Sequence, residues 1–118
     1  MREIRKVWPL FPAELATVWQ PRVDVYRTRK GWLLKVELAG VKLQDVSVTI
    51  HGRRVAISGC RKDSILEEGA SHYLMEISYS RFERVIDMPC GLETARVTLE
   101  ARDGLVLVHL ITEGHENG

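Results

Sequence analysis

Residues 23 to 60 read VDVYRTRKGWLLKVELAGVKLQDVSVTIHGRRVAISGC, and along much of this stretch apolar and polar side chains alternate at a period of two. Such alternation in short runs rich in valine and isoleucine is typical of half-buried β-strands. Lys30-Gly31 and Gly52-Arg53 stand where tight hairpins are expected to turn. The stretch therefore predicts about four strands.

The same rhythm continues toward the end of the chain. HYLMEIS (72–78), FERVIDM (82–88), RVTLEA (96–101) and LVLVHLI (105–111) each read as a further strand, which brings the expected total to about eight. Short strands without helices between them favour a sandwich or a small barrel. LVLVHLI is apolar on both faces, which indicates either a central core strand or a strand whose outer face is covered by an arm, a client or a partner subunit.

Composition narrows the class of protein. A chain of 118 residues is the size of one domain, and its net charge of +1 favours neither nucleic acid nor a membrane as a partner. No apolar run approaches the ~20 residues of a membrane span, so a cytoplasmic location is expected.

Cys60 and Cys90 are expected to be thiols, and the four histidines lack metal-site spacing. Motifs of nucleophilic or nucleotide-binding enzymes are missing, so we expect no enzyme, cofactor or metal.

Three parts are expected along the chain: an arm (1–20), a β-domain (21–112) and a short polar tail (113–118). The arm gathers apolar and aromatic side chains without a core of its own, and we expect it to contact clients. Its candidate residues are Trp8, Leu10, Phe11, Leu15 and Trp19.

A polar segment of eleven residues, 61–71, separates VAISGC from HYLMEIS and is too long for a tight turn. Tyr73, Met75 and Ile77 alternate on one face of HYLMEIS. An isolated two-stranded flap is marginal in water, so this strand is expected to join another sheet edge, which a second copy could offer.

Residues 21–112 resemble the α-crystallin domain of the small heat-shock proteins. The motifs that carry the likeness are Glu37-Leu38-Ala39-Gly40, Asp45-Val46, Ile57-x-Gly59, Phe82-x-Arg84, Pro89 and Asp103-Gly104-Leu105. The resemblance implies an immunoglobulin-like two-sheet β-sandwich that acts as an ATP-independent holdase on partly unfolded proteins. It also implies a homodimer formed by exchange of the strand at 72–78.

The resemblance also implies two kinds of site. One is a client-binding groove between two strands, which would be lined by Val46, Val48, Ile50, Val97 and Leu99. The other is a dimer interface, formed by Tyr73, Met75, Ile77 and Arg84. Arg84 lies on an apolar strand face, where it either reaches water or meets a carboxylate at the dimer contact.

This sequence departs from the family pattern at its end. Family members usually carry an I-x-I triplet that docks into the groove of a neighbouring dimer, whereas EGHENG (113–118) contains no apolar residue. We therefore expect dimers or small arm-linked assemblies. Two alternative functions stay open. One is a monomeric p23-like co-chaperone, and the other is a β-barrel that binds single-stranded nucleic acid through basic residues next to Tyr26 and Trp32.

Overall fold

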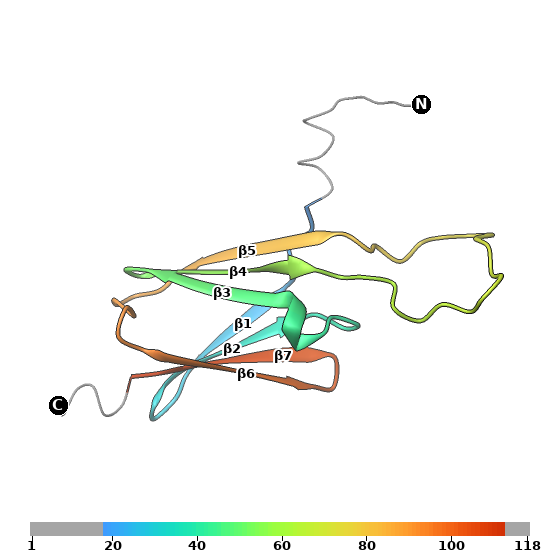
Figure 1. Cartoon of the computed structure of the whole chain (residues 1–118). Helices are drawn as coiled ribbons and strands as arrows, with labels where there is room; N and C mark the ends of the chain where they lie inside the picture. Colours follow the sequence, from blue (N-terminus) through green and yellow to red (C-terminus); the bar gives the residue numbers. More distant parts are fainter. Residues whose placement is uncertain (1–17, 113–118) are drawn as a thin grey trace.

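The computed structural model describes residues 18–112 and contains seven strands in two antiparallel sheets (Figure 1). A single-turn 3-10 helix, η1 (Leu43–Asp45), leads into β3. The strands are β1 (Val23–Arg27), β2 (Gly31–Glu37), β3 (Val46–His51), β4 (Arg54–Cys60), β5 (Arg81–Asp87), β6 (Arg96–Arg102) and β7 (Leu105–Ile111).

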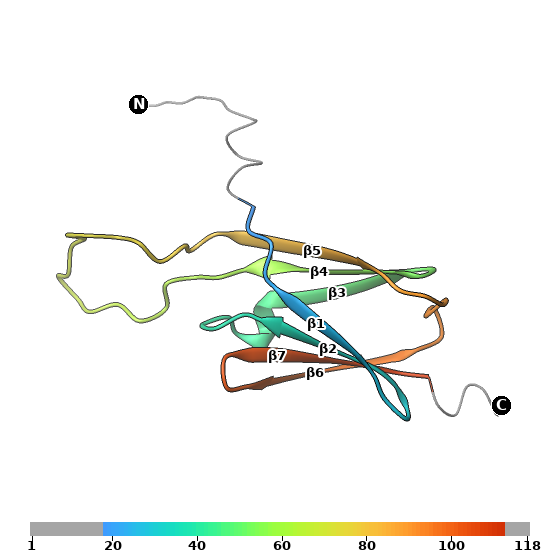
Figure 2. The same ribbon diagram turned by 180° about the vertical axis from the view of Figure 1, so that it is seen from behind.

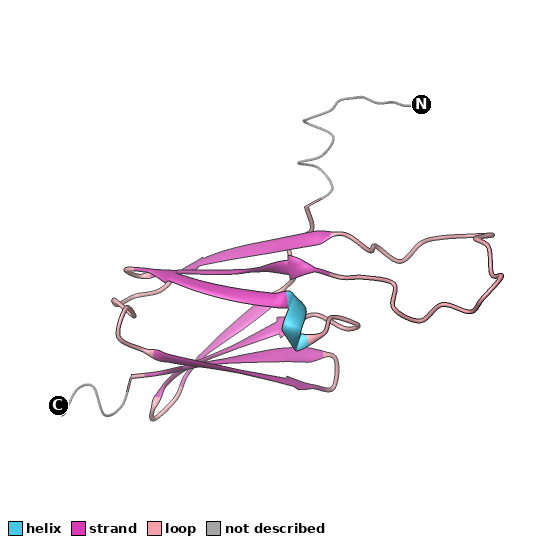
Figure 3. Cartoon of the chain, in the orientation of Figure 1, coloured by secondary structure: helices cyan, strands magenta, loops and turns pink. Residues whose placement is uncertain are grey.

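The two sheets face each other as the layers of a sandwich (Figures 1 and 3). One sheet has four strands in the order β1-β2-β7-β6, and the other has three in the order β3-β4-β5. The chain starts in the larger sheet, crosses to the smaller one through η1, and returns to place β7 beside β2. The predicted all-β two-sheet sandwich is confirmed.

The core lies between the sheets, because alternate residues of each strand point inward. On β4, for example, Val55 and Ile57 are fully buried while Arg54 is exposed. Phe82 on β5 is the largest buried side chain. The other core residues are Leu34, Val36, Leu38, Val41, Val46, Met88, Leu92, Val106, Val108 and Leu110.

β7 is a central strand. This was one of the two interpretations that its apolar sequence left open. It pairs with β2 on one side and β6 on the other. Leu107 points to the outer face, yet it is only 6% exposed. Its neighbours in register are Lys35 and Glu100, whose long side chains lie on the same outer face. Side chains of the same sheet therefore shield the outer face of β7.

The backbone conformation of the turn between β6 and β7 explains why Asp103 and Gly104 stand there. Asp103 has a φ of 54° and Gly104 a φ of 80°, so both central residues occupy the left-handed region. A two-residue hairpin turn of this kind matches the twist of the flanking strands, and Asp-Gly is among its preferred pairs.

The predicted count of about eight strands is too high for the described residues. HYLMEIS (72–78) forms no strand, and residues 61–80 make one long loop that reaches beyond the sandwich (Figures 1 and 2). Its apolar side chains are exposed to solvent. A strand needs a neighbour for its backbone N–H and C=O groups, and within residues 18–112 this segment has no such neighbour.

Candidate functional site

The five predicted groove residues lie on two edge strands, β3 and β6. These strands run along the same side of the sandwich, where η1 also contacts β6 (Figure 1). Val46 is buried, whereas Val48, Ile50 and Leu99 are half-buried against the core. Val97 is exposed. The structure thus gathers the set at one edge, with Val97 as its most accessible apolar side chain.

Edge strands also offer backbone groups. The outer N–H and C=O groups of β3 and β6 have no neighbouring strand in their own sheets, which makes both edges templates for an added extended segment. An extended peptide that pairs with such an edge places every second side chain against the apolar residues beside it.

The predicted dimer residues fall in two places. Tyr73, Met75 and Ile77 lie in the long loop and are 101%, 52% and 61% exposed. Arg84 lies on β5 on the same face as Phe82, and its Nη1 donates a hydrogen bond of 3.0 Å to the carbonyl of Pro21. Within one chain, Arg84 therefore ties the start of the β-domain to β5.

Of the predicted arm residues, Trp8, Leu10, Phe11 and Leu15 lie outside the described residues. Trp19 is described, and it packs on the sandwich. Its N–H donates to the carbonyl of Arg81, and its carbonyl accepts from the N–H of Glu83, both at 2.9 Å. Its ring meets Phe82 edge to face, with the centroids 5.8 Å apart. Trp19 thus extends the β5 edge by one short parallel bridge.

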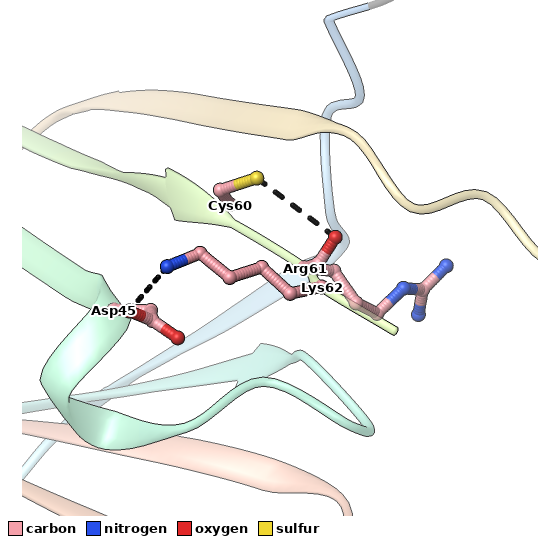
Figure 4. Close-up of polar contacts among 4 residues, drawn as sticks. All are labelled: Asp45, Cys60, Arg61 and Lys62. Atoms are coloured by element: carbon pink, nitrogen blue, oxygen red, sulfur yellow. Dashed lines mark hydrogen bonds and ion pairs between the residues drawn. The ribbon is translucent and has the colours of Figure 1, made fainter. Parts of the chain in front are cut away.

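Arg61 contacts several distant parts of the chain, which the sequence did not predict. It directly follows β4, and Figure 4 shows that its side chain points away from Asp45, whereas the next residue, Lys62, extends toward it. Lys62 Nζ lies 3.4 Å from Asp45 Oδ1. Arg61 instead contacts the Trp19 ring and the backbone carbonyls of Ala39 and Ser78. No local pattern in the sequence distinguishes it from its basic neighbours.

Other chemistry-bearing residues are spread out. Among residues 18–112, no group of three or more His, Cys, Asp or Glu side chains could hold a metal ion. Cys60 is half-buried, Cys90 is exposed, and both are free thiols. In the same part of the chain, no helix is long and apolar enough to span a bilayer.

In the nucleic-acid alternative, bases would stack on the rings of Tyr26 and Trp32. Each of these rings already contacts a cation of this chain. The guanidinium of Arg27 lies 5.0 Å from the centroid of the Trp32 ring, and Lys35 Nζ lies 4.6 Å from that of Tyr26. A base would have to displace these cations in order to stack on either ring.

The model of the Hsp20/alpha crystallin family matches residues 24–117. The chain belongs to this family. Membership confirms the resemblance found in the sequence.

Individual relatives agree with this placement. Spore protein SP21 of Stigmatella aurantiaca is 31% identical over 90 residues, which cover 76% of this chain and 53% of SP21. Small heat shock protein C2 of Rickettsia felis is 26% identical over 98 residues, or 83% of this chain and 62% of C2. This chain therefore spans between about half and two thirds of the length of these two relatives.

A solved structure shows the shared fold. Heat shock protein 16.0 from Schizosaccharomyces pombe superposes on this chain with a TM-score of 0.63 at 28% identity. The match covers 78% of this chain and 86% of that structure.

Proposed function

We propose that this chain is an ATP-independent holdase, which binds partly unfolded proteins and prevents their aggregation. The observation that carries the proposal is the edge between β3 and β6, where the apolar Val97 is exposed beside the half-buried Val48, Ile50 and Leu99. A second group of exposed apolar side chains lies on the loop at 61–80: Ile65, Leu66, Tyr73, Leu74, Met75, Ile77 and Tyr79. Exposed apolar patches of this kind mark interaction surfaces, whereas singly scattered apolar residues do not.

Two surfaces are proposed to bind clients. The first is the edge between β3 and β6, where Val97 is exposed beside the half-buried Val48, Ile50 and Leu99. The second is the arm, residues 1–20, with its apolar and aromatic side chains. Burial of apolar surface contributes roughly 25 cal/mol per Å², so a few side chains supply several kcal/mol, offset by ordering the client. Capture is therefore weak at each site and depends on several sites together.

The loop itself is proposed to form a homodimer. Tyr73, Met75 and Ile77 stand at alternate positions of residues 72–78, as on one face of a strand, yet this segment has no strand neighbour among the described residues. A free sheet edge of a second copy would satisfy their backbone groups and cover Tyr73, Met75 and Ile77. Exchange of this segment between two copies does both, and Arg84 is proposed to lie at the resulting contact.

A cytoplasmic location is proposed as well. Both cysteines of the chain, Cys60 and Cys90, are free thiols. Reduced thiols are typical of proteins that work inside the cell. We propose that the β-domain at 21–112 works there together with the arm at 1–20 and the tail at 113–118.

The test is aggregation of a heat-labile enzyme, followed by light scattering with and without this protein and without ATP. We expect scattering to fall progressively as the chain approaches equimolar amounts. A matched amount of serum albumin controls for crowding. Unchanged scattering at a severalfold excess of chain would contradict a holdase.

Two further measurements separate the alternatives. A p23-like co-chaperone would be monomeric in native mass spectrometry, whereas the exchange dimer has twice the chain mass of 13.5 kDa. A nucleic-acid-binding barrel would bind a fluorescent oligonucleotide with an affinity that falls as salt rises. We expect a dimer and no oligonucleotide binding.

A further inference from the structure

Arg61 joins three segments that are distant in sequence. Its Nε donates a hydrogen bond of 2.8 Å to the carbonyl of Ser78, and its Nη1 donates one of 3.2 Å to the carbonyl of Ala39. The guanidinium carbon lies 4.2 Å from the centroid of the Trp19 ring. The backbone N–H of Arg61 also donates to Ser80 at 3.0 Å.

Each of these partners has a place in the proposed chaperone. Ser78 ends the segment 72–78, which is proposed to exchange between two copies. Trp19 is the point where the arm meets the sandwich, through its two backbone hydrogen bonds to β5. Ala39 belongs to the loop between β2 and η1. Arg61 therefore stands between the root of the arm and the exit of the exchange segment.

An arginine is required for this arrangement. Its planar guanidinium presents donors in a fixed fork, so two donors reach two separate carbonyls while the flat face lies on an aromatic ring. A lysine keeps the charge and the contact with the ring, but its ammonium is a compact point charge on a flexible stem. It cannot hold the Ser78 and Ala39 carbonyls and the Trp19 ring in this one geometry.

We infer that Arg61 is a positioning residue for strand exchange, and that it couples the root of the arm at Trp19 to the exchange segment at Ser78. This inference rests on the proposed homodimer. The arginine holds the exit of the segment in one direction, which reduces the conformational freedom that the segment must lose when it pairs with the partner. A shift of Trp19 moves the ring under the guanidinium and changes that direction.

The test follows subunit exchange between the full chain grown with light and with heavy nitrogen, with heterodimers counted by native mass spectrometry. We expect Arg61→Lys to exchange subunits about tenfold faster than wild type, because a less ordered segment leaves the partner more readily. Arg54→Lys is the matched control. Arg54 begins β4, the strand that ends directly before Arg61, and its ion pair with Asp87 is exposed. This control is expected to exchange at the wild-type rate within about twofold.

Coupling to the arm is tested by adding Trp19→Leu. Alone, this change is expected to speed exchange by about as much as Arg61→Lys, and the double variant should be little faster than either single one, because both act through one contact. Melting temperatures are measured in parallel. If Arg61 merely stabilises the folded monomer, Arg61→Lys would lower the melting temperature and leave subunit exchange between folded dimers unchanged.

The outcomes distinguish this inference from the proposed function. A dimeric wild type whose exchange rate is unaffected by Arg61→Lys overturns the role of Arg61 alone. Fully multiplicative effects of the two substitutions overturn the coupling. A wild type that is monomeric throughout overturns both the exchange dimer and this inference.

Discussion

At the scale of single residues, Gly59 shows how closely a buried ring packs against the backbone of its own sheet. It lies on β4 at an inward-facing position, opposite Val46 on β3 and Phe82 on β5. A Cβ at this position would collide with the Asp45 carbonyl and come within 2.6 Å of the Phe82 ring. The absence of a side chain lets the largest core ring fill the space.

We predict that Gly59→Ala lowers the free energy of unfolding by about 1–3 kcal/mol, as overpacking of a filled core typically does. The measurement is urea unfolding followed by tryptophan fluorescence. Gly91→Ala is the control, because an added Cβ there meets no atom within 4 Å and its backbone is not in the left-handed region. Equal stability of Gly59→Ala and wild type would mean that Phe82 and η1 move aside freely.

At the scale of elements, the two regions of interest are a loop without a strand neighbour and an edge between two strands. Residues 72–78 keep the alternation of a strand, so one face carries Tyr73, Met75 and Ile77 and the other carries Leu74 and Glu76. When this segment pairs in a sheet, its two faces point to opposite sides and meet different surroundings. The faces can therefore be tested separately.

We predict that replacing Tyr73, Met75 and Ile77 together by serine yields a monomer with an intact sandwich. These side chains are exposed within one chain, so their loss leaves the core unchanged. Sedimentation velocity measures the mass, and circular dichroism checks the fold. Leu74→Ser, on the opposite face and itself 73% exposed, should remain dimeric. Dimers of the triple variant would show that the loop is not the interface.

The edge between β3 and β6 gives a second prediction at this scale. We expect Val97→Glu to weaken suppression of client aggregation severalfold, because a carboxylate at an apolar docking edge must be desolvated when a client binds. Val97 is 37% exposed, so the melting temperature should change little. Thr98→Glu puts the same charge on the outer face of the same strand and should keep full activity. Equal suppression by the two variants would argue against this edge.

At the scale of the whole molecule, the boundary between arm and sandwich is set by Trp19. Its backbone bonds to β5 and its ring contact with Phe82 make it part of the folded domain. Trp19, which the arm at 1–20 includes, therefore packs on β5. The client-binding role proposed for the arm can be separated from this structural one.

We predict that a chain lacking residues 1–17 loses much of its suppression of aggregation and keeps the melting temperature of the full chain. A chain lacking residues 1–19 should also lose stability, by about 1–3 kcal/mol, because it removes Trp19 from a half-buried contact with Phe82. Light scattering and thermal unfolding report the two effects. Full suppression by the shorter chains would remove the arm from the mechanism.

The sequence by itself determined the seven strands of the described residues, the sandwich and the family. Alternation at a period of two marks which side of β2, β4 or β5 enters the core, and the Asp103-Gly104 turn requires only two neighbouring residues. These are local signals, because a strand face and a tight turn depend on residues next to one another in the chain.

Only the tertiary structure decided how residues far apart in the chain meet. Tyr73, Met75 and Ile77 stand at alternate positions, as on one face of a strand, yet strand formation also needs a free sheet edge, which no local pattern reports. The contacts of Arg61 with Trp19, Ala39 and Ser78 likewise depend on where three loops converge. The same holds for the groove set, because Val46 and Val97 both lie on edge strands, yet packing in the core leaves Val46 buried and Val97 exposed.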